Sequence, residues 1–134
     1  MPAPPDIDYG SRLRVGVLIP SGTSVAEPEI RAMLPRDVSM LVTRLSLRGS
    51  SRAELMRMLD QLEAASELLA DAEVDCIVFH CTAVSTFAPE FAGGIRERIH
   101  RASGIKCFTT ADGILEGLRR LKAMRVSLLT PYID

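Results

Sequence analysis

The chain has 134 residues, of which 47% are hydrophobic and 25% charged, a composition typical of one ordinary globular domain and not of a disordered or fibrous chain. The formal net charge is -1 and aromatic residues make up only 4%, so nucleic acid is not expected as a partner. No apolar run approaches the ~20 residues that cross a bilayer, so no membrane partner is expected either.

The first residues are expected to differ from the rest of the chain. Residues 1–10 carry prolines and acidic residues without the basic and apolar regions of a signal peptide, which predicts a flexible amino-terminal arm. Residues 11–134 are expected to form a single α/β domain. An odd number of cysteines (Cys76, Cys81 and Cys107) in a chain with enough core to fold without disulfides favours a reduced, cytoplasmic setting.

Short β-branched apolar runs alternate with helical patterns along the chain, which is typical of βαβ units on a parallel sheet. The strands are expected at residues 13–19, 38–45, 76–80, 106–109 and 125–130. The helices are expected before residue 34 and at residues 52–72, 89–102 and 112–122. This pattern predicts a three-layer α/β/α fold with a doubly wound, flavodoxin-like parallel sheet of four or five strands.

Local signals predict where several helices begin and end. Ser24 with Glu27, or Thr23 one residue earlier, is expected to cap the first helix, and a capping box of Ser51 and Glu54 opens the second. Residues 81–85 are expected to form a turn, and Gly104 is expected to end the third helix. The last helix is expected to pack through four apolar residues: Ile114, Leu115, Leu118 and Leu121.

Charge is unevenly distributed along the chain. Residues 51–75 hold 2 Arg against 7 acidic residues, a net charge of -5, whereas residues 96–125 hold 8 Lys and Arg against 3 acidic residues, a net charge of +5. We interpret these segments as two solvated helix faces of opposite sign, with a docking surface as the alternative.

The expected sheet brings one group of residues to a single edge. Ligands of open parallel sheets bind beyond the carboxyl ends of the strands, where successive connections run in opposite directions. If the strand order begins 2-1-3, the turn of residues 21–23 lies beside Cys81 and Thr82, with residues 130–132 at the same edge. A cysteine that leads into a helix N-terminus lies near unpaired N–H groups, which favour the thiolate. Cys81 is therefore a candidate nucleophile or base, the alternative being a small buried hydrophobic residue.

The remaining cysteines and histidines are expected to be structural. Cys76 and Cys107 are predicted core residues, His80 is predicted to be packed because it points to the opposite face from Cys81, and His100 is predicted to be solvated. Neither metal-ligand spacing nor a glycine-rich nucleotide loop is present, so we expect no metal and no cofactor. A response-regulator receiver domain needs acidic residues after its first and third strands, where this chain has Pro20-Ser21 and His80-Cys81.

Four segments together resemble the aspartate/glutamate racemase superfamily, and within it the maleate cis-trans isomerases and arylmalonate decarboxylases most closely. The resemblance covers nearly the whole chain in order, but corresponds to the N-terminal half of the family's fold. The segments are Arg14-Val15-Gly16-Val17-Leu18-Ile19-Pro20-Ser21, Phe79-His80-Cys81-Thr82, Thr109-Thr110-Ala111 and Leu129-Thr130-Pro131-Tyr132.

The resemblance implies roles for particular residues. Cys81 would be the catalytic cysteine of the first of two pseudo-symmetric halves, and the residues implied to bind a substrate carboxylate are Ser21, Thr23, Thr82 and Tyr132. Maleate isomerases usually have asparagine at the position of Thr23. Arylmalonate decarboxylases typically have glycine at the position of Cys81 and keep their thiol in the second half, so Cys81 favours isomerase or racemase chemistry.

The expected function is therefore that of a cofactor-independent, maleate-isomerase-like isomerase or racemase that acts on a small dicarboxylate or amino acid. Two alternatives stay open: an arylmalonate-decarboxylase-like enzyme, and a non-catalytic α/β fragment that binds small acids. The expected partners are a small carboxylate substrate and further copies of the chain in a homo-oligomer. The chain ends without the helix that the βα rhythm calls for, which we interpret as a cut between two halves.

Overall fold

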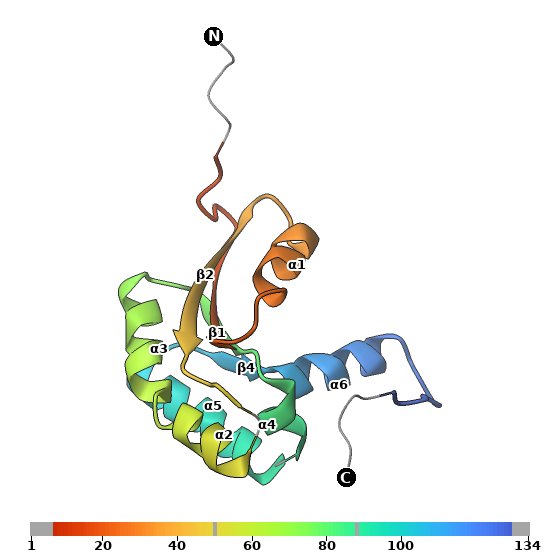
Figure 1. Ribbon diagram of the computed structural model, residues 1–134. Helices are drawn as coiled ribbons and strands as arrows, with labels where there is room; N and C mark the ends of the chain where they lie inside the picture. Colours follow the sequence, from red (N-terminus) through yellow and green to blue (C-terminus); the bar gives the residue numbers. More distant parts are fainter. Residues whose placement is uncertain (1–6, 50, 88, 130–134) are drawn as a thin grey trace.

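The computed structural model of the chain describes residues 7–49, 51–87 and 89–129. Within them, helices and strands alternate much as the sequence predicts (Figure 1). In chain order the elements are β1 (Leu13–Pro20), α1 (Ala26–Met33), β2 (Val38–Leu45), α2 (Arg52–Leu59), α3 (Leu62–Asp71), β3 (Cys76–Phe79), α4 (Thr82–Phe87), α5 (Pro89–Ser103), β4 (Cys107–Thr109) and α6 (Thr110–Arg120).

The four strands of the described residues form one parallel sheet in the order β2-β1-β3-β4. Leu13 pairs with Val38 at one end of β1, and Pro20 pairs with Leu45 at the other. This order confirms the expected 2-1-3 arrangement. It places the carboxyl ends of β1 and β3 side by side, where a doubly wound fold binds ligands.

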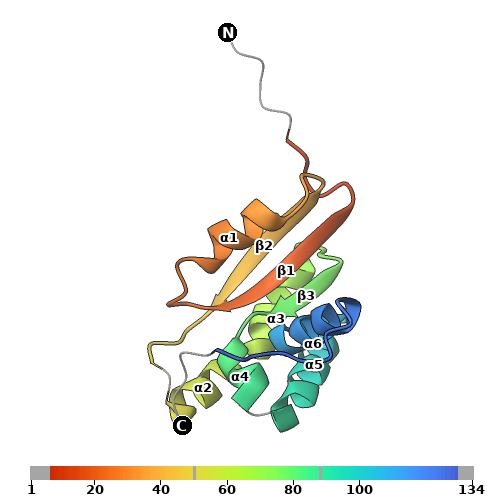
Figure 2. The same cartoon turned by 90° about the vertical axis from the view of Figure 1, so that its right-hand side faces the viewer.

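Helices cover both faces of the sheet, which confirms the three-layer α/β/α fold. The alternation of side chains along β1 sends Leu18 to one face and its neighbours Val17 and Ile19 to the other. Leu18 joins the larger core with α2, α3 and α5, whereas Val17 and Ile19 join a smaller core under α1. Figure 2 shows α1 on one side of the sheet and α3 and α5 on the other.

A glycine in β1 allows the larger core to pack closely. A Cβ atom on Gly16 would lie 3.0 Å from side-chain atoms of both Leu69 and Val74. Both side chains are buried, Leu69 in α3 and Val74 just before β3. The missing side chain of Gly16 therefore allows α3 to approach the sheet.

Two helix predictions near the start of the chain need correction. The predicted cap of the first helix by Ser24 or Thr23 is wrong, because Val25 is the N-cap and makes no side-chain cap bond. Glu27 instead forms an ion pair with the guanidinium of Arg44 in β2.

The long helix predicted at residues 52–72 opens on the expected capping box of Ser51 and Glu54 but is interrupted between α2 and α3. There, the side chain of Gln61 accepts a hydrogen bond from the Ser46 N–H at 2.8 Å and donates one to the Ser46 carbonyl at 3.2 Å. These two hydrogen bonds connect the break between α2 and α3 to the residue that follows β2.

The second half of the chain holds three further differences. The turn predicted at residues 81–85 is the start of α4. The predicted packing of the last helix is wrong for Ile114, Leu115 and Leu121, which are exposed, whereas Leu118 is half-buried. The fifth strand is wrong for residues 125–129, which are exposed and form no strand, while residue 130 lies outside the described residues. The three residues of β4 offer only a short edge for pairing, and α6 leads the chain away from it (Figure 1).

The acidic and basic segments of the sequence are in contact. Arg98 of the basic segment binds Glu63 of the acidic segment with two hydrogen bonds, at 2.5 and 2.7 Å, which join α5 to α3. The opposite charges therefore partly neutralise one another within the chain. In the described part of the chain, no helix has both the length and the apolar character required to cross a membrane.

Candidate functional site

Cys81 lies at the carboxyl edge of the sheet, beside the end of β1. Leu18 pairs with Phe79, and the His80 N–H continues the ladder by donating to the Leu18 carbonyl at 2.8 Å. Adjacent strands lie about 4.8 Å apart, so the residues that follow Phe79 run alongside Pro20 and the turn after it. The predicted juxtaposition of Cys81 with this turn is present in the fold.

The thiol of Cys81 is buried, with 6% of the residue exposed. Burial raises the pKa of this thiol, while hydrogen bonds from the backbone N–H groups of Val84 and Ala83 act in the opposite direction. We expected the start of the helix to favour the thiolate, and this expectation is wrong. The pKa of the thiol is raised overall, because the cost of desolvating the anion exceeds the effect of these donors.

The backbone that carries Cys81 is fixed by two hydroxyl groups. Ser85 of α4 is buried, and its Oγ donates to the Cys81 carbonyl at 2.9 Å. Thr110, at the start of α6, donates through its Oγ1 to the Phe79 carbonyl at 3.3 Å. The Thr109-Thr110 segment thus connects α6 to the end of β3.

The turn after β1 is held by its own polar groups and by Arg44. The Ser21 hydroxyl accepts the Leu47 N–H at 3.0 Å and lies 3.2 Å from the Leu47 carbonyl, to which it donates. The Thr23 N–H donates to the Pro20 carbonyl at 3.0 Å and closes the turn. A ligand of the Ser21 hydroxyl would therefore compete with Leu47.

Arg44 is a residue of this edge to which the sequence analysis assigned no role. Its Nη1 donates to the carbonyls of Ser21 at 2.8 Å and Thr23 at 3.0 Å, and its Nη2 pairs with Glu27. The available signal was a lone charged residue in an otherwise uncharged strand, at the end next to the predicted site.

The predicted substrate-binding residues divide into two groups. Ser21, Thr23 and Thr82 lie at the carboxyl edge of the sheet together with Cys81, and Thr23 and Thr82 are half-buried. Tyr132 lies outside the described residues.

The other titratable residues lie in varied surroundings. His80 is half-buried, as expected for a packed histidine, and burial lowers its pKa. Cys107 is buried as predicted, whereas Cys76 is only half-buried and so is less deeply placed than expected. His100 is exposed as expected, with Nδ1 3.1 Å from the Ile105 carbonyl oxygen.

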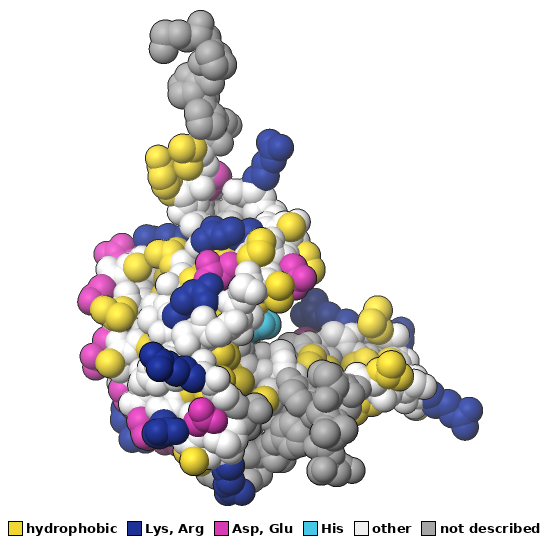
Figure 3. Space-filling model, viewed as in Figure 1, with side chains coloured by type: hydrophobic (Ala, Val, Ile, Leu, Met, Phe, Trp, Pro, Cys, Tyr) yellow, Lys and Arg dark blue, Asp and Glu magenta, His cyan; other side chains and the backbone are white. Residues whose placement is uncertain are grey.

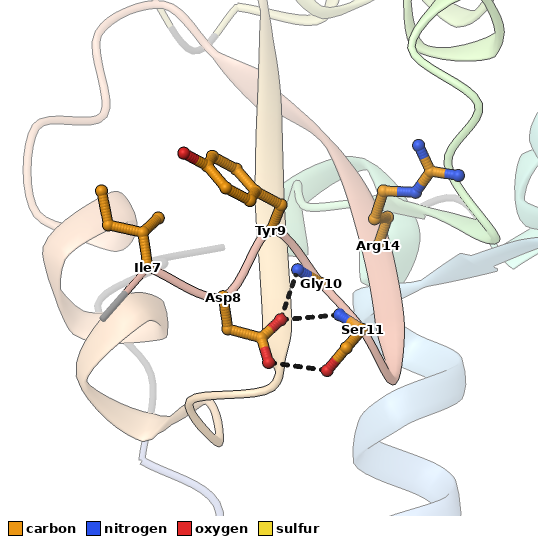
Figure 4. Close-up of a pocket in the computed structure, with 6 residues that line it drawn as sticks. All are labelled: Ile7, Asp8, Tyr9, Gly10, Ser11 and Arg14. Atoms are coloured by element: carbon orange, nitrogen blue, oxygen red, sulfur yellow. Dashed lines mark hydrogen bonds between the residues drawn. The ribbon is translucent and has the colours of Figure 1, made fainter. Parts of the chain in front are cut away.

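Two hollows lie away from this edge. One of about 450 Å³ is formed near the amino end of β1, where the Asp8 carboxylate accepts hydrogen bonds from Gly10 and Ser11 (Figure 4). It lies at the opposite end of β1 from the Cys81 site. The other, of about 710 Å³, is a groove between β4 and the charged side of α6, where Arg96 pairs with Asp112 and the Lys106 Nζ lies 5.0 Å from the centre of the Phe108 ring.

The sheet order and the cysteine at its carboxyl edge define a flavodoxin-like α/β unit of the aspartate/glutamate racemase type. The family model described as arylmalonate decarboxylase matches residues 15–134, and the chain belongs to that family.

Similar proteins include maleate isomerases as well as arylmalonate decarboxylases. The maleate isomerase of Nocardia farcinica is 30% identical over 137 residues, which cover 90% of this chain and 52% of that protein. A crystal structure of maleate isomerase from Pseudomonas putida S16 has a TM-score of 0.73 at 26% identity and covers 91% of this chain and 54% of that one. A double mutant of arylmalonate decarboxylase has a TM-score of 0.78 at 24% identity, with 91% and 52% covered, and supports the fold alone. The chain spans about half the length of the curated relatives it matches.

Proposed function

We propose that this chain is the first, cysteine-bearing half of an enzyme similar to maleate cis-trans isomerases, in which Cys81 adds to the double bond of a small unsaturated dicarboxylate. The observation that carries the proposal is the position of Cys81 directly after β3, beside the turn after β1 that bears Ser21 and Thr23. The relationship to the Nocardia farcinica maleate isomerase supports it, since a mutant of that protein has been solved with a covalently bound succinylcysteine intermediate.

The proposed reaction needs no cofactor and no net proton transfer. The Cys81 thiolate attacks one alkene carbon of maleate and forms a C–S bond, while the π electron pair moves to the neighbouring carbon and into its carboxylate. The bond between the two carbons is now single and rotates. The electron pair then re-forms the double bond, the C–S bond breaks, and fumarate leaves with the thiolate restored.

The negative charge that builds up on the carboxylate sets the second requirement of the site. Hydrogen-bond donors directed at that charge stabilise the transition state more than the ground state. We assign this role to Thr23, Thr82 and Tyr132, together with Ser21, whose hydroxyl would give up one of its bonds to Leu47.

The proton on Cys81 sets a third requirement. Because burial raises the pKa of this thiol, most of it carries a proton at neutral pH. We therefore expect the rate to rise with pH until the thiol is ionised.

Decarboxylation of an arylmalonate is the second candidate, and the match to the arylmalonate decarboxylase family model favours it. In that reaction a C–C bond breaks, carbon dioxide leaves, and the remaining carbanion takes a proton from a thiol. The thiol at position 81 favours isomerisation over this candidate, because typical decarboxylases carry glycine there. Since the chain spans half of its relatives, we propose that the rest of the pocket lies outside these residues.

Proton NMR in D₂O tests these candidates. The chain is incubated with maleate, phenylmalonate and the enantiomers of aspartate and glutamate, and Cys81→Ala is compared with the matched variant Cys76→Ala from the same strand. Fumarate formed by the wild type and by Cys76→Ala, but not by Cys81→Ala, would support the isomerase. Phenylacetate would support decarboxylation, and deuterium at the α-carbon of an amino acid would support racemisation. Binding without any conversion would mean either that residues outside this chain are required for the reaction or that the chain only binds acids.

A further inference from the structure

The groove between β4 and α6 has the size of a small-molecule site. Its volume is about 710 Å³, and sites for small organic molecules typically enclose about 300 to 1,000 Å³. Lys106, just before β4, lines it together with Cys107 and Phe108 of that strand. Because β4 is the last strand in the order of the described sheet, the groove runs along the edge of the sheet. Neither Cys81 nor the turn after β1 contributes to its lining, so it is a second hollow with its own residues.

Positive charge is in excess among the side chains of the groove. The cationic side chains are Arg96, Lys106, Arg119 and Arg120, and the carboxylates are those of Asp112 and Glu116. Each carboxylate has its own arginine, since Arg96 pairs with Asp112 and Arg120 pairs with Glu116. The side chains of Lys106 and Arg119 form no ion pair or hydrogen bond with any residue that the structure describes. The groove therefore holds two positive side chains that are available to a ligand.

Apolar surface lies beside these unpaired charges. The Lys106 Nζ lies 5.0 Å from the centre of the Phe108 ring, so the ammonium group and the ring occupy the same part of the groove. Phe108 is 40% exposed, and Leu115, which lines the groove from α6, is 51% exposed. A ligand between β4 and α6 would remove apolar surface from water on both elements. Charge and apolar surface together favour a ligand that is anionic at one end and apolar at the other.

We propose that this groove binds a small organic phosphate with an apolar body, such as an aryl phosphate. A phosphate group carries close to two negative charges at neutral pH, which matches the two unpaired cations. Arg119 and Lys106 donate to its oxygens, since guanidinium and ammonium groups are both strong phosphate ligands. Phe108 and Leu115 contact the apolar body. Figure 3 shows Lys and Arg side chains on the part of the molecule where α6 projects.

This site is independent of the proposed catalytic function, because its residues take no part in the reaction at Cys81. Titration of the ¹⁵N-labelled chain with phenyl phosphate, followed by NMR, tests the proposal. We expect saturable shifts of the backbone amides of residues 106–108 and 113–120. Inorganic phosphate lacks the ring and benzoate carries a single negative charge, so each should bind about tenfold more weakly than phenyl phosphate.

Two charge variants test the residues that hold the phosphate. Lys106→Gln and Arg119→Gln should each weaken the binding of phenyl phosphate by about tenfold, because each removes a charge-assisted hydrogen bond. Lys122→Gln and Arg101→Gln are the matched controls. They remove the same charge from exposed residues that do not line the groove, and should leave the affinity unchanged. Circular dichroism verifies that each variant is folded.

Any of four results would overturn the proposal. The first is the absence of saturable shifts at residues 106–108. The second is a set of shifts confined to residues 21–23 and 81–82, which would place the anion at the candidate site instead. The third is equal weakening by Lys106→Gln and Lys122→Gln, which would show that only the net charge of the chain matters. The fourth is binding of inorganic phosphate or benzoate as tight as that of phenyl phosphate.

Discussion

The guanidinium of Arg44 donates a hydrogen bond to the carbonyl of Ser21 across 2.8 Å, and so connects the end of β2 to the turn that follows β1. Backbone carbonyls at the end of a strand need partners, and here a side chain from the neighbouring strand provides them. The same guanidinium reaches Thr23 and Glu27, so one residue holds both the turn and the first turn of α1.

Replacing Arg44 by alanine is expected to loosen this turn. Two carbonyls and one carboxylate lose a charged donor, which should lower the free energy of unfolding by about 1 to 2 kcal/mol. The variant should accelerate amide hydrogen exchange, measured by NMR, more at Thr23 than in the strands of the sheet. Arg12→Ala is the control, because the Arg12 side chain forms an exposed ion pair at 3.9 Å with Asp37 and its backbone bond to Asp37 survives the substitution. Equal effects of the two variants would show that Arg44 does not hold the turn.

Substitution of Gly16 by alanine is expected to destabilise the fold. The new methyl group would lie 3.0 Å from the side chains of Leu69 and Val74, so both must shift in a packed core. The expected loss is about 1 to 3 kcal/mol in a urea titration. Gly22→Ala is the matched control, because the nearest atom to its Cβ is the Leu47 carbonyl oxygen at 3.6 Å. An unchanged midpoint for Gly16→Ala would mean that α3 can move away from the sheet without cost.

The ion pair between Glu63 and Arg98 should make stability depend on pH in the acidic range. The hydrogen bonds from Arg98 hold the pKa of Glu63 below its ordinary value of 4.5. The stabilisation is therefore present above that value and disappears as the pH falls through the lower pKa of the folded state. Glu63→Gln should cost about 1 kcal/mol at neutral pH, and this difference should shrink as the pH falls below 4.5 and through the lower pKa of the folded state.

Urea unfolding at several pH values measures this difference, with Glu97→Gln as the control. Glu97 forms an exposed pair with Arg101 one helical turn away, which contributes little. A Glu63→Gln difference that stays constant across the pH range would contradict the assignment.

Cys107 should make the chain less stable at alkaline pH. Burial raises the pKa of this thiol from 9.0 to about 12. The unfolded thiol therefore ionises first, and the free energy of unfolding falls as the pH rises from 9.0 toward about 12. Between about pH 8 and about pH 10.5, the wild type should lose about 2 kcal/mol more than Cys107→Ala, since each pKa unit corresponds to 1.36 kcal/mol. If the free energies of unfolding of the two proteins fall in parallel as the pH rises, the Cys107 thiol does not contribute to the loss of stability.

Local sequence signals were sufficient to predict much of the fold. The strand predicted at residues 38–45 has those bounds in the structure, because its apolar alternation and its flanking polar residues are both short-range features. The capping box of Ser51 and Glu54 also forms, because its two partners lie three residues apart. The position of Cys81 beside the end of β1 followed from the order of the strands, which the βαβ pattern restricts to few choices.

The sequence by itself therefore determined the fold class, the positions of the four strands that form the sheet and the edge at which Cys81 lies, since local patterns specify each of them. Only the tertiary structure decided where the second helix is interrupted, which carboxylate Arg44 binds and whether burial or helix donors control the Cys81 pKa. These outcomes depend on contacts between residues far apart in the chain, such as Gln61 with Ser46. The exposure of the apolar residues of α6 belongs to the same class, because a sequence pattern specifies an apolar face but not what covers it.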